Sequence, residues 1–244
     1  MAQTSLEKKL DEFVQRLKNA AAENLQAAVL YGSAVTGEFH AEHSDLNLLC
    51  VVERADPPLL EALHPVVQWW LGQGHRAPLV FTWDELQRSA DVFAIELTDM
   101  KAHHRLLWGE DLLAGLTIPL RYHSLQVERE LRTNWLRLRQ AILAAPNKKK
   151  ARVQLMVSSF SAFTALFRHA LIALGEAPAA NKRESIDRIA KFVRSDPSGF
   201  RTILDLREGK KREQDINVEE TLNNYFALVE TVTNEYDRQL DARA

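Results

Sequence analysis

The amino-terminal part of the chain alternates between helical and strand-like spacing of its apolar residues. Over residues 5–23 apolar positions recur every three or four residues, which predicts an amphipathic helix. Two short apolar runs follow at 26–32 and 46–53, and the second has the aliphatic, β-branched character of an inner strand. A helix over 59–72 and a strand over 77–82 continue the alternation. This pattern predicts an α/β unit.

Two more elements are predicted before the strand signals end. Thr82 and Glu85 form a T-x-x-E capping box, which predicts a helix over 83–88, and the run DVFAIEL predicts a fourth strand at 91–97. From Tyr122 onward the spacing is helical, over 122–144, 151–174, 182–195, about 200–208 and 218–240. We therefore expect an α/β (α+β) chain. A small mixed sheet with flanking helices should fill residues 1–118, and an all-α helical bundle residues 119–244.

Composition places the chain among globular proteins. Its hydrophobic content of 46% is enough for a core and excludes disorder and collagen. The single cysteine, Cys50, cannot form an intramolecular disulfide, and the first residues carry no apolar signal core, so we expect a cytoplasmic location. Residues 153–174 are long enough to cross a bilayer. Because Arg168 and His169 interrupt this segment, we expect a buried bundle helix and no membrane partner.

Charge is unevenly distributed, although the formal net charge is only −2. Residues 1–115 carry nine Lys and Arg against 17 Asp and Glu, whereas residues 116–244 carry 22 against 16. The basic run Lys148–Lys150 lies at a predicted turn between helices, where lysines ordinarily serve solubility. The charge pattern therefore does not favour nucleic acid as a partner, and it leaves the oligomeric state open.

The residues best suited to chemistry lie around the end of the first predicted strand. Gly32 and Ser33 end that strand at a turn, where free backbone N–H groups and a hydroxyl can bind a phosphate. Ser44 and Asp45 precede the second strand, and Asn47 lies two residues beyond Asp45, on the same face. Oxygen ligands on a strand can hold Mg²⁺ against a triphosphate. The pattern therefore indicates phosphoryl or nucleotidyl transfer.

This G-S-x-x-x-G pattern, followed by S-D-L-N-L, resembles the nucleotidyltransferase superfamily of DNA polymerase beta type. The later segment FAIELTDMKAHHRLLWGEDLL, followed by helices, is similar to bacterial proteins of the kanamycin nucleotidyltransferase kind. The resemblance implies transfer of a nucleoside monophosphate from a nucleoside triphosphate, ATP first among them, to a small hydroxylated acceptor. It implies that Gly32, Ser33 and Ser44 bind the nucleotide and that Asp45 and Asn47 ligate Mg²⁺.

The chain departs from the family pattern at two of its three carboxylates. Asn47 replaces the second aspartate, and the strand that should carry the third reads Arg76-Ala77-Pro78-Leu79. Glu96, on the predicted fourth strand, is the candidate for a replacement carboxylate, with local ion pairing as its alternative role. Two functions therefore stay open. The chain is a nucleotidyltransferase with catalytic residues Asp45, Asn47 and Glu96, or a catalytically lapsed homologue that binds a nucleotide or a partner.

Two other functional classes receive less support. His40, His43 and Cys50 suggest zinc, but no fourth ligand has finger-like spacing and Cys50 lies in a predicted buried strand. A purely structural interaction module would have no need of Gly32, Ser33 and Asp45.

Overall fold

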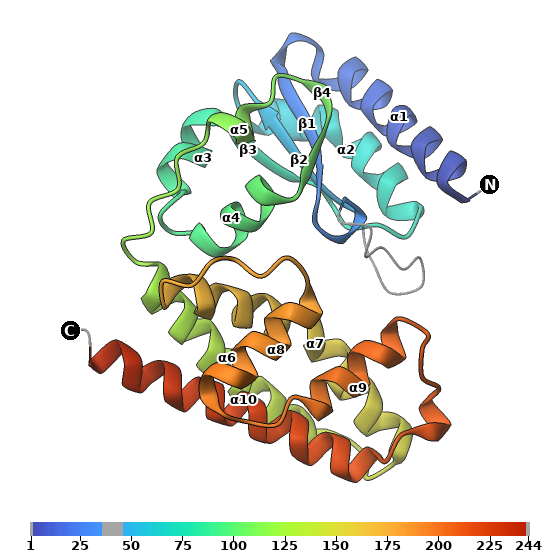
Figure 1. Cartoon of the computed structure of the whole chain (residues 1–244). Helices are drawn as coiled ribbons and strands as arrows, with labels where there is room; N and C mark the ends of the chain where they lie inside the picture. The colour runs from blue at the N-terminus through green and yellow to red at the C-terminus, as the bar shows by residue number, and fades with distance from the viewer. Residues whose placement is uncertain (1, 36–45, 243–244) are drawn as a thin grey trace. The chain divides into compact units, whose positions relative to one another are not determined.

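The computed structural model describes residues 2–35 and 46–242, apart from the side chains of 2–5 and 33. Contacts divide the chain into two compact units, Met1–Leu120 and Arg121–Ala244. In Figure 1 the first unit runs from blue to green and the second from green to red. Sheet and helices occur together in the first unit, whereas every regular element described in the second is a helix.

A four-stranded sheet in the order β3-β2-β1-β4 forms the centre of the first unit. Strand β1 (Leu25–Tyr31) pairs antiparallel with β2 (Asn47–Val52) on one side and with β4 (His104–Gly109) on the other. Strand β3 (Leu79–Thr82) pairs parallel with β2. The predicted small mixed sheet is therefore confirmed.

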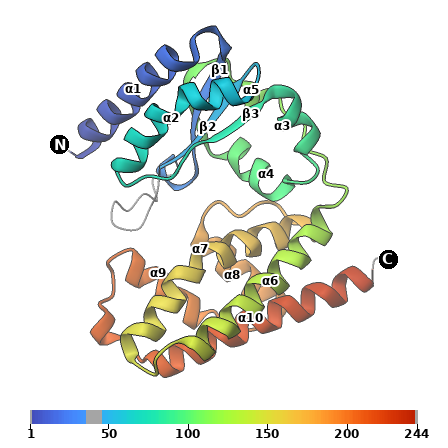
Figure 2. The same cartoon turned by 180° about the vertical axis from the view of Figure 1, so that it is seen from behind.

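Helices cover both faces of this sheet (Figures 1 and 2). On one face lie α1 (Ala2–Ala21) and α2 (Pro57–Gly72), joined to the sheet by a core that includes Ala28 and Leu30. On the other lie α3 (Trp83–Ser89), α4 (Ala94–Ala102) and α5 (Leu112–Gly115), whose core includes Ala27 and Val29. Alternate residues of β1 thus enter two different cores, as the two-residue period of a strand requires.

The predicted strand at 91–97 is wrong. Its second half begins helix α4, which buries Ala94, Leu97 and Met100 at intervals of three and packs Leu97 and Met100 into the core on the second face of the sheet. The fourth strand is β4 instead, an edge strand with several exposed positions, which leaves only a weak apolar pattern in the sequence. The capping box of α3 is confirmed. Thr82 Oγ1 accepts from the Glu85 amide at 3.1 Å, and Glu85 Oε2 accepts from the Thr82 amide at 2.8 Å.

The second unit contains five α-helices in its described part. They are α6 (His123–Ala144), α7 (Lys149–Ala173), α8 (Lys182–Val193), α9 (Ser198–Arg207) and α10 (Val218–Asp241). Helix α7 packs against all the others. It is long and apolar enough to cross a membrane, but half of its most apolar window is buried inside the protein. Such packing is typical of the central helix of a bundle.

Aromatic side chains fill the centre of the bundle. The rings of Phe200 and Tyr225 stack at 3.9 Å between centroids, and Phe163 contacts both of them edge-on. The close approach of α9 and α10 depends on Gly199, because a Cβ there would lie 2.3 Å from the Tyr225 amide nitrogen. Burial raises the pKa of Tyr225, and its hydroxyl lies 2.9 Å from Ser159 Oγ.

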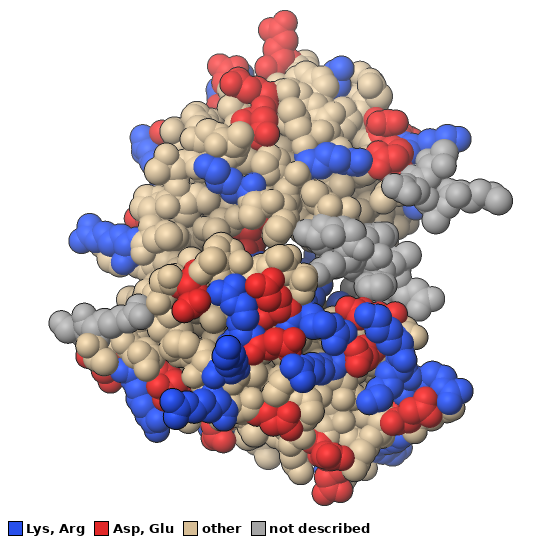
Figure 3. Space-filling model, in the orientation of Figure 1, with Lys and Arg blue, Asp and Glu red and all other residues tan. Residues whose placement is uncertain are grey.

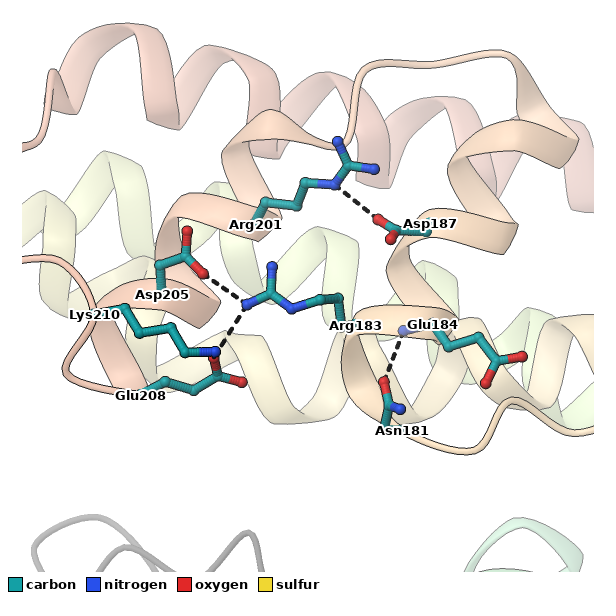
Figure 4. Close-up of polar contacts among 8 residues, drawn as sticks. All are labelled: Asn181, Arg183, Glu184, Asp187, Arg201, Asp205, Glu208 and Lys210. Atoms are coloured by element: carbon teal, nitrogen blue, oxygen red, sulfur yellow. Dashed lines mark hydrogen bonds and ion pairs between the residues drawn. The ribbon is translucent and has the colours of Figure 1, made fainter.

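Charged side chains of both signs are interleaved on the surface of the bundle (Figure 3). Between α8 and α9, Arg183 donates to Asp205 Oδ1 at 2.6 Å and to Glu208 Oε2 at 3.1 Å, as Figure 4 shows. Lys210 lies 2.6 Å from the same Glu208 oxygen. Lys210 and Arg183 together hold the pKa of Glu208 below its usual value. This network ties the end of α9 to the start of α8.

Gly199→Ala should destabilise the protein by about 1–3 kcal/mol, the usual cost of forcing extra atoms into a packed core. The new methyl would meet the α10 backbone at Tyr225 and Thr221. Gly72→Ala is the matched control, because a Cβ at that position meets nothing within 4 Å. Urea unfolding of both variants measures the difference, and equal stabilities would contradict the close-packing argument.

Acid should weaken the bundle through the lowered pKa of Glu208. A carboxyl whose pKa is lowered by folding stabilises the protein above its unfolded pKa, here 4.5, and this stabilisation is lost as the pH falls further. Arg183→Met should cost up to about 1 kcal/mol at neutral pH, since the pair is partly exposed, and should reduce the stability that is lost as the pH falls below 4.5. Arg88→Met, which breaks the exposed pair with Asp84, should leave the pH profile unchanged.

Candidate functional site

One end of the sheet brings three residues level with one another across its strands. Tyr31, the last residue of β1, pairs with Asn47 on one side and with His104 on the other. Cross-strand partners project from the same face of a sheet. We call His104, Tyr31 and Asn47 the end row. The parallel pairing of β2 with β3 starts further along, at Leu49 and Leu79.

Gly32 follows the end row directly and has a backbone conformation that only glycine adopts without strain. Its φ is +83°, and a Cβ built on it would lie 3.3 Å from Asn47 Nδ2. Its amide donates to the His103 carbonyl at 3.1 Å, and its carbonyl accepts from the Val35 amide at 2.9 Å. The turn Gly32–Ala34 is a single 3₁₀ turn. Gly32 therefore leaves room beside the Asn47 amide, but its own N–H is already bonded to His103.

Asn47 is the one polar residue of β2. Leu46 and Leu48 are buried in the core beneath α1 and α2, as the sequence predicts. Asn47 lies on the opposite face of the strand, the face that carries Leu49 and Val51. Asn47 is only partly buried. An amide held at the open end of a strand can donate through Nδ2 or accept through Oδ1.

Tyr31 and Arg76 bring a hydroxyl and a positive charge to the same end of the sheet. Burial raises the pKa of Tyr31, and the charge of Arg76 lowers it in part. The raised pKa keeps the phenol protonated at neutral pH, so that Tyr31 retains a hydrogen that it can donate. Arg76 is exposed and lies three residues before β3. Its guanidinium suits phosphate oxygens better than metal ions, because all its polar hydrogens are donors.

His104 closes the end row on the β4 side. Its Nε2 lies 2.9 Å from Asp111 Oδ1 and its Nδ1 lies 3.0 Å from the Lys101 carbonyl oxygen. Both ring nitrogens therefore face acceptors, which fixes the orientation of the ring. The same Asp111 oxygen accepts from the Ala114 amide at 3.1 Å and so caps α5. His104 is consequently a structural anchor that joins β4 to α4 and α5.

The residues described at this end of the sheet do not make up a magnesium site. Asn47 Oδ1 is a single neutral oxygen, Ala77 brings no ligand, and Arg76 adds a positive charge that opposes a cation. Among the described residues no three His, Cys, Asp or Glu side chains are grouped to hold a metal. For zinc, burial raises the pKa of Cys50 to about 12, which disfavours the thiolate that a metal requires; His40 and His43 lie outside the described residues.

The remaining predicted site residues are distributed as follows. Ser44 and Asp45 lie outside the described residues, and so does the side chain of Ser33. Glu96 lies in the first turn of α4, exposed, and not on a strand as predicted. Seven helical positions, or about 10 Å along the axis, separate it from His103, whose carbonyl accepts from Gly32. The structure does not bring Glu96 into the end row.

One residue at this site had no signal in the sequence pattern. Tyr31 ends an apolar run and reads as a core residue, and only the pairing of β1 with β2 brings it beside Asn47. Arg76 had an indirect signal, because it begins the segment Arg76-Ala77-Pro78-Leu79, where the family pattern has its third carboxylate.

Comparison with known proteins identifies the fold. No protein-family model and no curated protein sequence matches the chain. Among solved structures, it is similar to a spectinomycin adenyltransferase, AAD(9), from Enterococcus faecialis, solved with ATP and spectinomycin. The match has a TM-score of 0.52 at 15% sequence identity and covers 91% of this chain and 99% of that chain. The resemblance noted in the sequence is therefore confirmed at the level of the fold.

A second structure is similar over a shorter stretch. It is a toxin–antitoxin solved with AMP-PNP, which matches at 22% identity over 49% of this chain and 92% of that chain. Its TM-score of 0.33 is too low to establish a common fold.

Proposed function

We propose that the chain binds a nucleoside triphosphate, ATP first, at the end row and transfers its nucleoside monophosphate to a small hydroxylated acceptor. The observation that carries this proposal is the junction of Gly32 with Asn47. A glycine with φ of +83° leaves room beside an amide side chain at the end of two paired strands. The fold is shared with an adenyltransferase that was solved with ATP and a small-molecule ligand, spectinomycin.

The proposed reaction is an in-line displacement at the α-phosphorus. A hydroxyl oxygen of the acceptor forms a bond to this phosphorus as the bond to the bridging oxygen breaks, and pyrophosphate leaves with the electron pair. The proton of the hydroxyl passes to a base or to solvent. Asn47 and Tyr31 would orient the phosphates by hydrogen bonds, and Arg76 would stabilise the charge that develops on pyrophosphate.

Magnesium remains a prediction from the sequence. Asp45 is the carboxylate proposed to ligate it, with Asn47 as a weaker ligand, whereas Glu96, the predicted third carboxylate, lies on α4 outside the end row. Such an ion would supply positive charge to the triphosphate. Because the described residues do not fit a magnesium site, the roles assigned above to Asn47, Tyr31 and Arg76 do not depend on the metal.

The second candidate function is nucleotide binding without transfer. It is favoured by the end row itself, which offers one amide and one phenol where metal-dependent transfer requires several carboxylate oxygens. The affinity for a nucleotide and the rate of nucleotidyl transfer therefore have to be measured separately, and each has its own experiment.

Gly32→Ala should weaken ATP binding at least tenfold while the protein stays folded, because the added methyl would crowd Asn47 Nδ2. Gly74→Ala is the matched control. Gly74 has a similar φ of +85°, but a Cβ there meets nothing within 4 Å, so the variant shares the backbone strain of about 1–2 kcal/mol without touching the site. Calorimetric titration with ATP measures both variants. Native affinity in a folded Gly32→Ala protein would remove the end row from consideration.

Asn47→Asp should speed nucleotidyl transfer and tighten Mg²⁺ binding about tenfold. A restored charge is worth around 4 kcal/mol at 4 Å and an effective dielectric of 20, and half of this is already more than tenfold. Asp45→Asn should have the opposite effect. The control is Gln26→Glu, which makes the same amide-to-acid exchange at an exposed position near the far end of β1. Transfer of labelled phosphate from [α-³²P]ATP gives the rates.

Two results would change this view of Asn47. If the native protein transfers nucleotides briskly and Asn47→Asp lowers the rate, the amide is part of an active site that needs no second carboxylate on β2. If neither protein turns over with any Mg²⁺ or Mn²⁺ concentration but ATP still binds, the binding function stands and the transferase function is discarded.

A further inference from the structure

Two basic runs that are far apart in the sequence lie side by side at one end of the bundle. The first is Lys148–Lys150, at the start of α7, and the second is the turn at 209–212, after α9. Lys149 Nζ donates to the Gln214 carbonyl at 3.2 Å, so the turn lies against the start of α7 (Figures 1 and 2). The fold therefore adds a second basic run to the one that stands alone in the sequence. We call the two segments together the basic end, residues 148–152 and 208–215.

The turn of the basic end is held in place by its backbone. Gly209 ends α9 with a φ of +69°. The amides of Lys210 and Lys211 both donate to the Asp205 carbonyl, at 2.8 and 3.1 Å. Both lysines are exposed. Hydrogen bonds to α9 thus fix the backbone from which these two side chains project.

Most of the positive charge at the basic end is not neutralised by the protein itself. The two segments carry seven Lys and Arg against three Asp and Glu, an excess that the formal net charge of −2 conceals. Two of the carboxylates already have cations as partners, Glu208 with Lys210 at 2.6 Å and Asp215 with Arg212 at 2.8 Å. Within the described part of the chain, four cations of the basic end have no side-chain partner: Lys148, Lys150, Arg152 and Lys211.

The lysines of the basic end also oppose the electrostatics of the helix that carries them. A helix N-terminus has partial positive charge, and acidic residues stabilise it. The first turn of α7 contains no acidic residue, and its N-cap, Lys148, makes no capping hydrogen bond through its side chain. Helices α3, α8 and α10, by contrast, have acidic first turns and capping side chains at Thr82, Asn181 and Asn217. The lysines therefore lower the stability of α7, and a bound anion would offset this loss.

The composition of the basic end favours a nucleic acid over a protein or a membrane as the partner. Protein–protein interfaces are depleted of lysine, whereas protein–nucleic acid interfaces are polar and strongly positive. Five of the seven cations are lysines, and neither segment contains an aromatic or a large aliphatic side chain. Nothing in these segments could therefore enter a bilayer or stack on an unpaired base. Lysines attract phosphates as point charges, so the contacts would reach the backbone and not the bases.

We propose that the basic end binds the phosphate backbone of a double-stranded nucleic acid without regard to base sequence. The contacts come from the four cations that have no partner in the protein. A duplex suits them because it carries one negative charge per about 1.7 Å of its axis. This function is separate from the proposed nucleotidyl transfer, because it uses no residue of the end row.

Fluorescence anisotropy of a labelled DNA duplex, titrated with the full chain, tests the proposal. We expect a Kd of about 10⁻⁴ to 10⁻⁶ M at physiological salt, the range of non-specific binding. Four phosphate contacts predict a slope of about −3.6 for log affinity against log salt, because each contact contributes about −0.9. The affinity should therefore fall on the order of a hundredfold between about 50 and 200 mM salt.

Lys150→Glu separates a loss of binding from a loss of folding. The new acid lies in the first turn of α7, so it should preserve or raise the stability measured by urea unfolding. Duplex binding should weaken about tenfold or more, and the salt slope should become shallower by about one. Lys211→Gln should also reduce the slope by about one. The matched control is Lys8→Glu, the same charge reversal at an exposed lysine of α1, which should bind as the native protein does.

The remaining arms decide the class of the partner. Polyglutamate that binds as tightly as the duplex would identify an acidic polypeptide, and phosphatidylserine vesicles that bind more tightly would identify a membrane surface. Either result overturns the proposal, and so does native affinity in Lys150→Glu or a preference for one of two unrelated duplex sequences. Gly32→Ala should bind the duplex normally whatever its affinity for ATP, which keeps this test apart from that of the proposed function.

Discussion

The pairing of β1 with β2 determines the rest of the first unit. Both strands are buried on both faces, so alternate residues belong to two separate cores, one beneath α1 and α2 and one beneath α3, α4 and α5. A slip of one residue would exchange the two sets and bury Asn47 in the place of Leu48. Because two cores oppose such a slip, the position of Asn47 beside Tyr31 is fixed far more firmly than its own hydrogen bonds could fix it.

The elements that the sequence predicted correctly are those whose burial follows one period. Helices α1, α6 and α10 bury one stripe, α7 is apolar around most of its circumference, and β2 is apolar beyond Asn47, so each has a local signature. The segment around α4 has two competing signatures. Phe93, Ile95 and Leu97 fit the period of a strand, whereas Ala94, Leu97 and Met100 fit that of a helix. The sheet face above Val29 and Val51 is covered by the helical set, and only tertiary contact decides between them.

The candidate site was predictable only where it depends on local sequence. Gly32 ends a strand, and a glycine at that point predicts a tight turn. The face of the sheet on which Asn47 lies follows from the two-residue period of a strand. Arg76 is 29 residues from Asn47 along the chain and lies three residues before β3, which pairs with β2 after a parallel crossover through α2. Glu96 was expected on a strand for the same reason that α4 was missed. Asp45 and Ser44 remain predictions from the sequence.

The charge at the end of the sheet then separates two ways of holding a triphosphate. In a cation-bridged site, acidic residues lie beneath the phosphates, and the positive charge of the metal ion offsets the negative charge of both. Arg76 already has that sign. A divalent cation about 4 Å from a guanidinium would be repelled by around 8 kcal/mol at an effective dielectric of 20, twice the value for two unit charges. Arg76 would therefore disfavour a metal ion close to its guanidinium, and Asn47, which stands where the family pattern has its second aspartate, brings no charge to offset that repulsion.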